Sequence, residues 1–499
     1  MSSISTSTSG FKRIWLLLAA TLGGVAVASL RPGRGRIASA VSGRRLSSRN
    51  FRLAKLGARS GGRYAKYRAQ RIFADADRST ALDNEFQMRT AAEVTATLGQ
   101  MKGAMMKIGQ MASYLDTGLP DAVRTTLSSL QHDAPPMSAE LAAEQIEAEL
   151  GAHPDVLFAR WDPVPLASAS IGQVHRAITH DDRAVAVKVQ YPGVAEAMSS
   201  DLSNADWIFG GMATMFPGLE KGPIIEELKT RLIEELDYEL EAQRQMKFHN
   251  YYKGHPLVTV PAVLEELSTR RVLTSELAEG VRFKEVLSWP QAERNLAAET
   301  LFRFSFGAIY RLHAFNGDPH PGNYLFQPGG RVTFLDFGLV KEFAPAETKL
   351  FEDLIKHMVL DHDAVAFRTL IEEAGLLDPA ADFSDKEVID YFSFYYLYVM
   401  EDKPVTIDAD YASAGVAQLF NTGSEHGSLM KHLNVPPSFV VLQRITLGLM
   451  GLFAQLDATA NWRRVAEELW PFVDADPSTP IGELHRNWEI ATGRRERPF

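Results

Sequence analysis

Four polar residues, far apart in the sequence but in a fixed order, limit most strongly what this 499-residue chain can fold into. Lys188 lies in the apolar stretch AVAVKVQ, Asp318 and Asn323 stand five positions apart in GDPHPGNYLF, and Asp336 begins Asp-Phe-Gly after the apolar run VTFL. Mg²⁺ prefers carboxylate and amide oxygens beside nucleotide phosphates, so we expect Asn323 and Asp336 to hold the metal. We expect Asp318 to accept the proton of an attacking hydroxyl group and Lys188 to bind phosphate. A lone Asp in a loop of Gly and Pro is usually a turn residue, but the ordered set favours a catalytic site.

The segment before Lys188 supports the same interpretation. PLASASIGQVHRA, residues 165–177, is a loop of small residues followed by a strand that carries a lysine, which is the order of a protein kinase N-lobe. Short β-like runs fill residues 158–189, and helical patterns dominate from residue 289 onward. We therefore predict an α+β fold of the atypical protein-kinase-like type, with two lobes, an added N-terminal helical extension and a mostly helical C-lobe.

The predicted domain boundaries follow these changes in pattern. Residues 1–74 hold an apolar anchor at about 14–30 and a basic juxtamembrane linker, and residues 75–151 form a helical extension. Residues 152–280 form the N-lobe. Residues 281–499 form the C-lobe, which carries the catalytic loop and the Asp-Phe-Gly segment.

The loop over the nucleotide is unusual because kinase phosphate loops are rich in Gly and this one has a single Gly. Its backbone N–H groups can still face phosphate, but Ala and Ser remove the positive-φ conformations that Gly permits. We therefore expect a stiffer loop, and expect Ala169→Gly to change the affinity or selectivity for ADP and ATP. The residues expected to contact the nucleotide, besides Lys188, are Ala167, Ser168, Ala169, Ser170, Ile171, Gly172 and Gln173 of the loop, and Glu276, Leu277 and Ala278 of the later connector.

A lysine buried in a strand needs a charged partner, and an acidic helix follows Lys188 in the sequence. LIEELDYELEA places Asp237 and Glu241 four residues apart, on one face of the expected helix. Glu235 lies on a different face of that helix and would need another partner. We expect Glu241 to pair with Lys188. A solvated face is the simpler interpretation of the remaining acidic residues.

The catalytic segments depart from ordinary protein kinases in two ways. The position two residues before Asp318, a His in the kinase motif, is Asn316, and we expect the upstream His313 to brace the loop by hydrogen bonding. Six residues separate Gly338 from Pro345, where protein kinases have a long activation loop. This segment is too short to form a platform for a peptide substrate.

The N-terminal 74 residues differ in charge from the rest of the chain. They contain 15 Lys and Arg and no acidic residue, whereas the rest contains 37 basic and 62 acidic residues. The uncharged run Ile14–Leu30 would span roughly 26 Å as a helix, just enough for a bilayer. An apolar run beside a basic arm favours a lipid partner over nucleic acid, and the following Arg residues place the body on the cytoplasmic side of a membrane. A cleaved secretory signal and an organelle transit peptide remain alternatives.

Composition narrows the chemistry further. The chain has no Cys, which excludes disulfides, thiolate metal ligands and a cysteine nucleophile. Its length is sufficient for several domains with large cores.

Together these motifs resemble the AarF/UbiB (aarF-domain-containing) atypical kinases. MKIGQ matches the Lys-x-Gly-Gln motif of that family at Lys107, Gly109 and Gln110, and EELDYELEA matches its Glu-x-Asp motif at Glu235 and Asp237. LASASIGQVH matches its Ala-rich loop, and DPHPGN with DFG matches its catalytic and metal loops. The resemblance is close over about residues 90–347 and looser beyond them.

The resemblance implies more than the spacing does. In that family the Lys-x-Gly-Gln segment belongs to a helical extension that folds over the nucleotide site and contacts the Glu-x-Asp motif. Carried over, Lys107 joins the catalytic residues, and Gln110 lies near Glu235, Asp237 and the phosphates. Without the resemblance, the simpler interpretation of this Met-rich helix is a packing helix with a lysine that reaches solvent.

The predicted function is that of an ATP-binding, Mg²⁺-dependent atypical kinase or ATPase that acts at a membrane surface. The resemblance implies a role in isoprenoid quinone or lipid metabolism, with membrane lipids and quinone intermediates as partners, and a homodimer or quinone-pathway enzymes as further partners. One alternative is a pseudokinase scaffold that binds ATP or ADP and organises partner enzymes. Another is a phosphotransferase for hydrophilic small molecules. An organelle inner membrane is the alternative location.

Overall fold

The computed structural model describes residues 137–169, 171–195, 230, 233–413, 429–434 and 437–494. The predicted apolar anchor, the Lys-x-Gly-Gln residues Lys107, Gly109 and Gln110, and the loop residue Ser170 lie outside the described residues. The chain divides into two compact units, and the one that contains the kinase motifs consists of residues 137–191 and 226–499.

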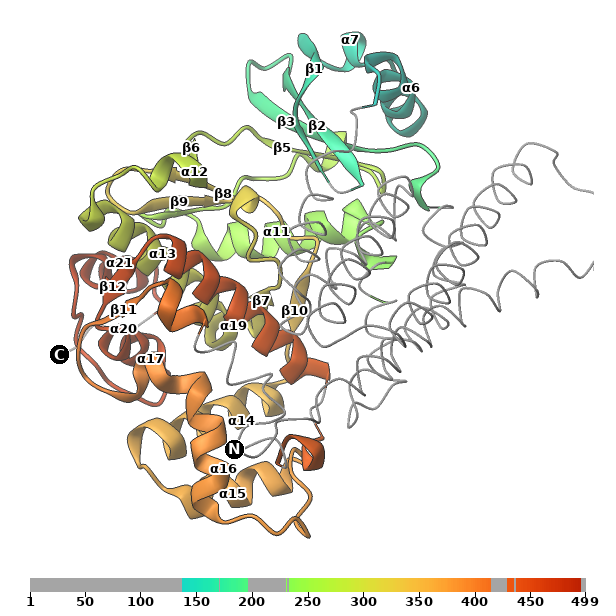
Figure 1. Ribbon diagram of the computed structural model, residues 1–499. Helices are drawn as coiled ribbons and strands as arrows, with labels where there is room; N and C mark the ends of the chain where they lie inside the picture. The colour runs from blue at the N-terminus through green and yellow to red at the C-terminus, as the bar shows by residue number, and fades with distance from the viewer. Residues whose placement is uncertain are drawn as a thin grey trace, which may run out of the picture. The chain divides into compact units, whose positions relative to one another are not determined.

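The small lobe of this unit is built on a four-stranded antiparallel sheet in the order β1-β2-β3-β5 (Figure 1). Its strands are β1 (Arg160–Ser168), β2 (Gly172–Ile178), β3 (Ala184–Gln190) and β5 (Val272–Glu276). On β3 the alternating residues Val185, Val187 and Val189 are fully buried. The sequence AVAVKVQ therefore forms the strand that its period of two predicts, with Lys188 directed to the opposite face of the sheet.

Helix α6 (Ala139–Leu150) covers one face of this sheet, and the one-turn helix α7 (Pro154–Leu157) follows it. The Ser138 side chain caps the N-terminus of α6, and Gly151 ends it with a left-handed φ of 79°. Ala142 and Ile146 of α6 pack in the same core cluster as the β3 valines. We therefore count α6 with the N-lobe, although the sequence analysis placed it in the helical extension.

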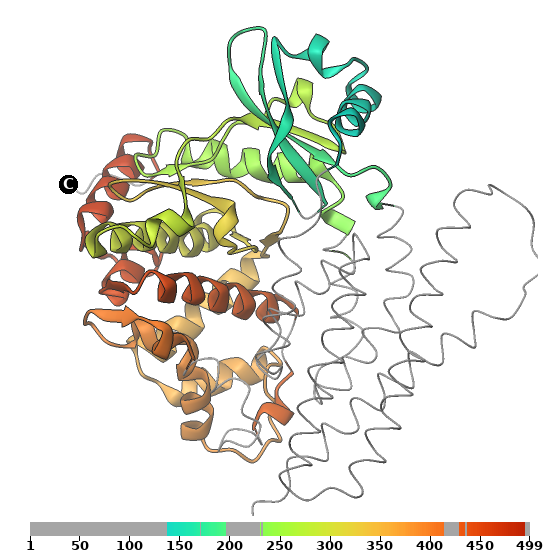
Figure 2. The same cartoon turned by 45° about the horizontal axis from the view of Figure 1, so that its top comes forward.

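Helix α11 (Tyr238–Tyr252) connects the small lobe to the large one. Its N-terminal half carries Glu241 toward β3, and its C-terminal residues Phe248 and Tyr252 belong to the core cluster of the large lobe. The helix therefore has a fixed position relative to both lobes (Figure 2).

The large lobe is organised around the buried helix α13 (Gln291–Leu312). Beside it lies a second four-stranded sheet in the order β4-β9-β8-β6, and a two-stranded sheet pairs β10 with β7. The strands are β4 (Val258–Thr259), β6 (Val281–Arg282), β7 (Ala314–Asn316), β8 (Tyr324–Gln327), β9 (Arg331–Phe334) and β10 (Val340–Glu342), with α12 (Phe283–Val286) after β6. Strands β8 and β9 form a hairpin that turns at the sequence QPGGR, residues 327–331.

The rest of the large lobe is helical and its core is aromatic. Phe302, Phe453 and Trp462 are buried side by side, with ring centroids 5.3 to 6.4 Å apart. The elements are α14 (Pro345–Ile355), a π-turn (Lys356–Leu360), α15 (Ala364–Glu373), α16 (Asp385–Ser393), α17 (Leu397–Met400), β11 (Val405–Ile407), α19 (Pro437–Gln455), β12 (Ala458–Ala460), α20 (Trp462–Leu469) and α21 (Pro480–Ala491). The predicted α+β bilobal kinase-like fold is confirmed.

None of the helices within the described residues is both long and apolar enough to cross a bilayer. The run Ile14–Leu30, for which a membrane anchor is predicted, is outside that part of the chain.

Candidate active site

The centre of the candidate site is the ammonium group of Lys188. Its Nζ donates to both carboxylate oxygens of Glu241, at 2.7 and 2.9 Å, and lies 3.6 Å from Oδ2 of Asp336. The side chains of Lys188 and Glu241 are only 17% and 3% exposed. Burial by itself would lower the pKa of Lys188, but the charges of Asp336 and Glu241 outweigh burial and raise that pKa well above its usual value. The predicted pairing is present, and it holds a charged lysine beside the Asp-Phe-Gly aspartate.

Glu241 reaches Lys188 because of how α11 begins. Asp237 is the N-cap of α11, and its Oδ1 accepts from the backbone N–H groups of Glu239 and Leu240 at 3.1 Å. The chain turns at residues 235–236, so EELDYELEA is not the continuous helix that the sequence analysis assumed. Asp237 therefore sets the start of the helix instead of lying on one helical face with Glu241, and Oδ2 of Asp237 lies 3.5 Å from Nε of Arg270.

Glu235 occupies the turn before α11. Burial raises the pKa of Glu241, and the positive charge of Lys188 only partly offsets this rise. The negative charges of Asp336 and Glu235 raise the pKa of Glu241 further. The two Glu-x-Asp residues thus differ in what they do: Asp237 caps the helix, and Glu235 adds negative potential near the lysine.

Hydrogen bonds fix Asn323 within the catalytic loop and connect that loop to the metal loop. The amide nitrogen of Asn323 donates to the carbonyl oxygen and to Oδ2 of Asp318, at 3.0 and 3.1 Å. The backbone N–H of Leu335 donates to the Asn323 carbonyl at 3.0 Å, across the β8–β9 hairpin. Asn323 and Asp336, 13 positions apart in the sequence, therefore emerge at the same end of this hairpin.

Asn316 is a brace that the sequence analysis did not identify. Its amide nitrogen donates to the carbonyl oxygen of Asp336 at 2.8 Å, and its amide oxygen accepts from the backbone N–H of Asp318 at 3.4 Å. His313, expected to brace the loop, instead ends α13 with a left-handed φ of 48° and shares a 3.1 Å hydrogen bond with Thr348 of α14. The position of Asn316, two residues before Asp318, was the signal in the sequence that could have indicated this bracing role.

The oxygens at the end of the hairpin fit a hard cation. Oδ1 of Asp336 accepts from the backbone N–H of Gly338 at 2.9 Å, and the side chain is 33% exposed. Because the Asn323 amide nitrogen is engaged by Asp318, its amide oxygen is the atom available to a cation. One carboxylate, one amide oxygen and nucleotide phosphates form the type of ligand set that Mg²⁺ takes. Asn323 and Asp336 would hold the ion.

The single Gly of the phosphate loop has a packing function. The loop is the turn between β1 and β2, closed by a 2.9 Å hydrogen bond from the Ala169 N–H to the Gly172 carbonyl. A Cβ atom on Gly172 would lie 2.2 Å from the Val189 carbonyl oxygen and 3.1 Å from the hydroxyl of Tyr238. Gly172 therefore lets the turn lie directly against β3 and the start of α11.

Gln173, predicted to contact the nucleotide, has its side chain inside the N-lobe. It is fully buried, accepts from the Met137 N–H at 2.9 Å, donates to the Met137 carbonyl at 3.4 Å and lies 2.8 Å from Nε2 of His175. At the connector, Leu277 donates its backbone N–H to Ala184 at 2.9 Å, and Glu276 accepts from Ala262 through Oε2 at 3.1 Å. The side chain of Gln173 is therefore committed to the packing of the N-lobe, and its backbone lies in the sheet between β1 and β3.

Comparison with known proteins agrees with this geometry. Residues 129–369 match the ABC1 atypical kinase-like domain. The chain is 32% identical over 397 residues to an uncharacterized aarF domain-containing protein kinase, At1g71810, of the Arabidopsis thaliana chloroplast, covering 76% of this chain and 54% of that protein. It is 31% identical over 269 residues to the mitochondrial atypical kinase COQ8 of Saccharomyces cerevisiae, covering 54% of each. The resemblance inferred from the motifs is confirmed, and the matches span about half the length of these relatives.

A solved structure is similar over most of the chain. Rv3197 of Mycobacterium tuberculosis, in complex with erythromycin, is 29% identical with a TM-score of 0.58, and the match covers 80% of this chain and 99% of that one.

Proposed function

Because this chain carries an ABC1 atypical kinase-like domain over residues 129–369, we propose that it binds ATP with Mg²⁺ and transfers or hydrolyses the terminal phosphoryl group. The observation that carries the proposal is the buried Lys188, which both oxygens of Glu241 hold within 3.6 Å of Asp336. A lysine fixed by a helix glutamate beside the Asp-Phe-Gly aspartate is the arrangement that positions phosphates in kinases.

Each residue has a role that follows from its contacts. Lys188 supplies a fixed positive charge to the phosphates, because Glu241 removes its freedom to move. Asn323 and Asp336 would hold Mg²⁺, which neutralises negative charge on the phosphates when bound. Asp318, held by Asn323 through its Oδ2, would orient the attacking hydroxyl group or water and accept its proton.

The acceptor is not a protein segment in this proposal. Strand β10 starts two residues after Gly338 and pairs with β7, and α14 starts at Pro345. This segment is too short to bind an extended peptide. We propose instead a small lipid-like acceptor, or ATP hydrolysis coupled to the movement of a lipid or quinone intermediate at a membrane surface. The basic, apolar N-terminal arm supports this location, and the Arabidopsis and yeast relatives are chloroplastic and mitochondrial proteins.

The test is phosphate release from Mg-ATP by the full chain, with and without anionic liposomes, for the wild type and Asp336→Asn. We expect hydrolysis that liposomes stimulate and that Asp336→Asn lowers at least 100-fold, roughly the cost of removing a catalytic charge. Asp390→Asn is the matched control, because Asp390 is 44% exposed on α16 and, within the described part of the chain, its ion pair is with the exposed Lys386. Equal turnover in Asp336→Asn and the control would contradict the proposal. Nucleotide binding without turnover under every condition would favour the scaffold alternative.

A further inference from the structure

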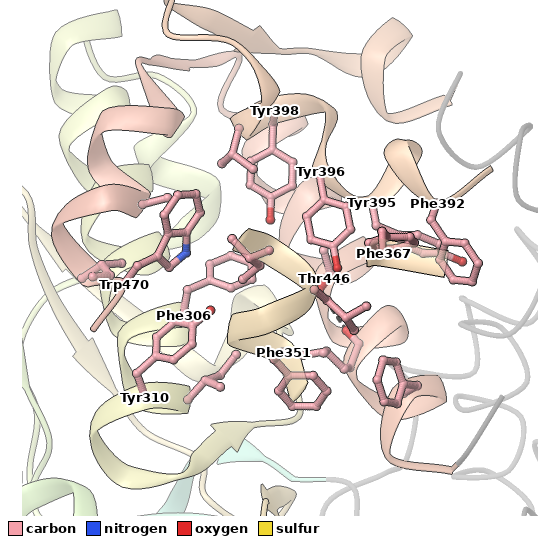
Figure 3. Close-up of a pocket in the computed structure, with 18 of the residues that line it drawn as sticks. Phe306, Tyr310, Phe351, Phe367, Phe392, Tyr395, Tyr396, Tyr398, Thr446 and Trp470 are labelled. Atoms are coloured by element: carbon pink, nitrogen blue, oxygen red, sulfur yellow. Dashed lines mark hydrogen bonds between the residues drawn. The ribbon is translucent and has the colours of Figure 1, made fainter. Parts of the chain in front are cut away.

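The helical lobe contains an apolar pocket away from the candidate active site. It has a volume of about 120 Å³ and is lined by side chains of α13, α14, α15, α16, α19, α20 and the segment around α17. Figure 3 shows aromatic side chains on most sides of it, among them Phe306, Tyr310, Phe392 and Trp470. None of the described residues that line the pocket carries a charge. Its walls are therefore suited to a neutral, flat molecule.

Two hydroxyl groups face this pocket without a hydrogen bond to any other described residue. Figure 3 shows the rings of Tyr396 and Tyr398 with their hydroxyl ends directed toward the middle of the pocket. Within the described residues, no hydrogen bond satisfies either hydroxyl, and Tyr398 is only 9% exposed. Other tyrosines nearby differ, since Tyr310 interacts with Trp470 and Tyr395 with Tyr391. Burial raises the pKa of both Tyr396 and Tyr398, so both remain protonated hydrogen-bond donors at neutral pH.

We propose that this pocket binds a small neutral molecule, about the size of a substituted benzene ring, that carries an acceptor oxygen. The size follows from the volume, because an apolar cavity of roughly 150 Å³ takes up benzene. The neutral charge follows from the uncharged walls, since a buried unpaired charge is costly. The acceptor oxygen follows from the two donors, because a hydroxyl that faces an apolar pocket without a partner is unfavourable and a carbonyl or ether oxygen of the ligand satisfies it.

The elements around the pocket also support the catalytic loops. Helix α13 ends at Leu312, immediately before β7 and Asn316, and α14 begins at Pro345, directly after the segment that follows Asp-Phe-Gly. On α19, Thr446 lines the pocket, and Gly448 lies so close to Pro319 that a Cβ there would be 2.4 Å from Cγ of that proline. A ligand in the pocket thus contacts helices that hold the catalytic and metal loops, and we expect it to change the rate of phosphate release. That consequence rests on the proposed function, whereas binding itself does not.

The test measures binding to the full chain by calorimetry, with three probes of similar size. Acetophenone has a ring and a carbonyl acceptor, isopropylbenzene has the same shape without the acceptor, and benzoate has a negative charge. We expect acetophenone to bind roughly three- to ten-fold more tightly than isopropylbenzene, the difference that one or two neutral hydrogen bonds make. We expect no binding of benzoate.

Variants locate the site. The double substitution Tyr396→Phe with Tyr398→Phe keeps the shape of the pocket and removes both donors, so it should abolish the preference for acetophenone and leave the affinity for isopropylbenzene unchanged. Tyr411→Phe is the matched control, because the buried hydroxyl of Tyr411 has no hydrogen-bond partner among the described residues and Tyr411 does not line the pocket. The inference is overturned if neither neutral probe binds up to its solubility limit, if benzoate binds as tightly as acetophenone, or if the preference persists in the double variant. These outcomes are independent of ATP hydrolysis, so they are distinguishable from a failure of the proposed function.

Discussion

Replacing Glu241 by Gln tests the electrostatics of the site most directly. The substitution keeps the size of the side chain and one acceptor oxygen, but removes the charge that faces Lys188 in a nearly dry environment. The two side chains lie 2.7 Å apart and are 3% and 17% exposed, so little water is available to replace the lost charge. Lys188 would then depend on Asp336, whose Oδ2 is 3.6 Å away and whose side chain is 33% exposed.

The magnitude follows from these contacts. Removing one partner of a buried ion pair costs about 3–5 kcal/mol, because the other charge remains buried and uncompensated. Asp336 and the partial exposure of Lys188 reduce this cost, so we expect Glu241→Gln to lower the free energy of unfolding by about 3 kcal/mol. Replacing both residues, with Lys188→Met beside Glu241→Gln, should recover much of the loss, because no buried charge is left without a partner.

The assay is urea unfolding at pH 7, followed by circular dichroism and by tryptophan fluorescence, to which Trp161 of the small lobe contributes. Coincident transitions are required for a single unfolding free energy. Glu239→Gln is the matched control, because Glu239 lies on the first turn of the same helix and is exposed, and its effect should stay within about 0.5 kcal/mol. The reasoning is wrong if Glu241→Gln lowers the unfolding free energy no more than Glu239→Gln does. It is also wrong if the double variant loses more unfolding free energy than the sum of the losses of the Lys188→Met and Glu241→Gln single variants.

Three further predictions concern the turn, the C-lobe and the loop brace. Gly172→Ala should lower the unfolding free energy by about 2–3 kcal/mol in calorimetry, because its methyl group would lie 2.2 Å from the backbone oxygen of Val189; a stable variant would show that the turn can shift. Burial lowers the pKa of His255 to about 3, so the stability present above pH 6.5 should fall as the pH falls, by about 1–2 kcal/mol at pH 5. His255→Asn keeps an acceptor for the two backbone N–H groups that bind Nδ1. This variant should therefore show a flatter dependence of the urea midpoint on pH. Asn316→Ala should reduce phosphate release about ten-fold or more, because it removes the hydrogen bond to the Asp336 carbonyl. Unchanged turnover would show that Asn316 does not position Asp336.

Local signals in the sequence account for where some helices begin and end. Helix α6 lies between the cap Ser138 and the left-handed Gly151, and both residue types report these positions without any tertiary contact. The order of the motifs was also sufficient for the Lys188–Glu241 pair, because an ion pair in this fold joins a fixed strand to a fixed helix. The start of α11 was missed for a different reason: Asp237 was counted as a helical residue, although Asp is a strong N-cap.

Contacts between distant segments were not predictable in the same way. Gln173 bonds to Met137, 36 positions earlier, and only the packing of α6 on the sheet brings them together. A glycine is required at position 172 because β3 lies so close to the turn, and a sequence pattern does not report that distance. The aromatic residues around the pocket have the spacing of ordinary core positions. The hydroxyls of Tyr396 and Tyr398, which bond to no other described residue, distinguish this pocket only once the side chains are placed.

The two-stranded sheet of β7 and β10 has a consequence for the control of this protein. Residues 339–344, between Asp-Phe-Gly and α14, contain no Ser, Thr or Tyr, and three of them are paired with β7. In many kinases, phosphorylation of a hydroxyl in this segment orders the loop and turns the enzyme on. Here the segment offers no hydroxyl to phosphorylate and is already ordered by its strand partner, so this loop has no place for the phosphorylation switch of those kinases.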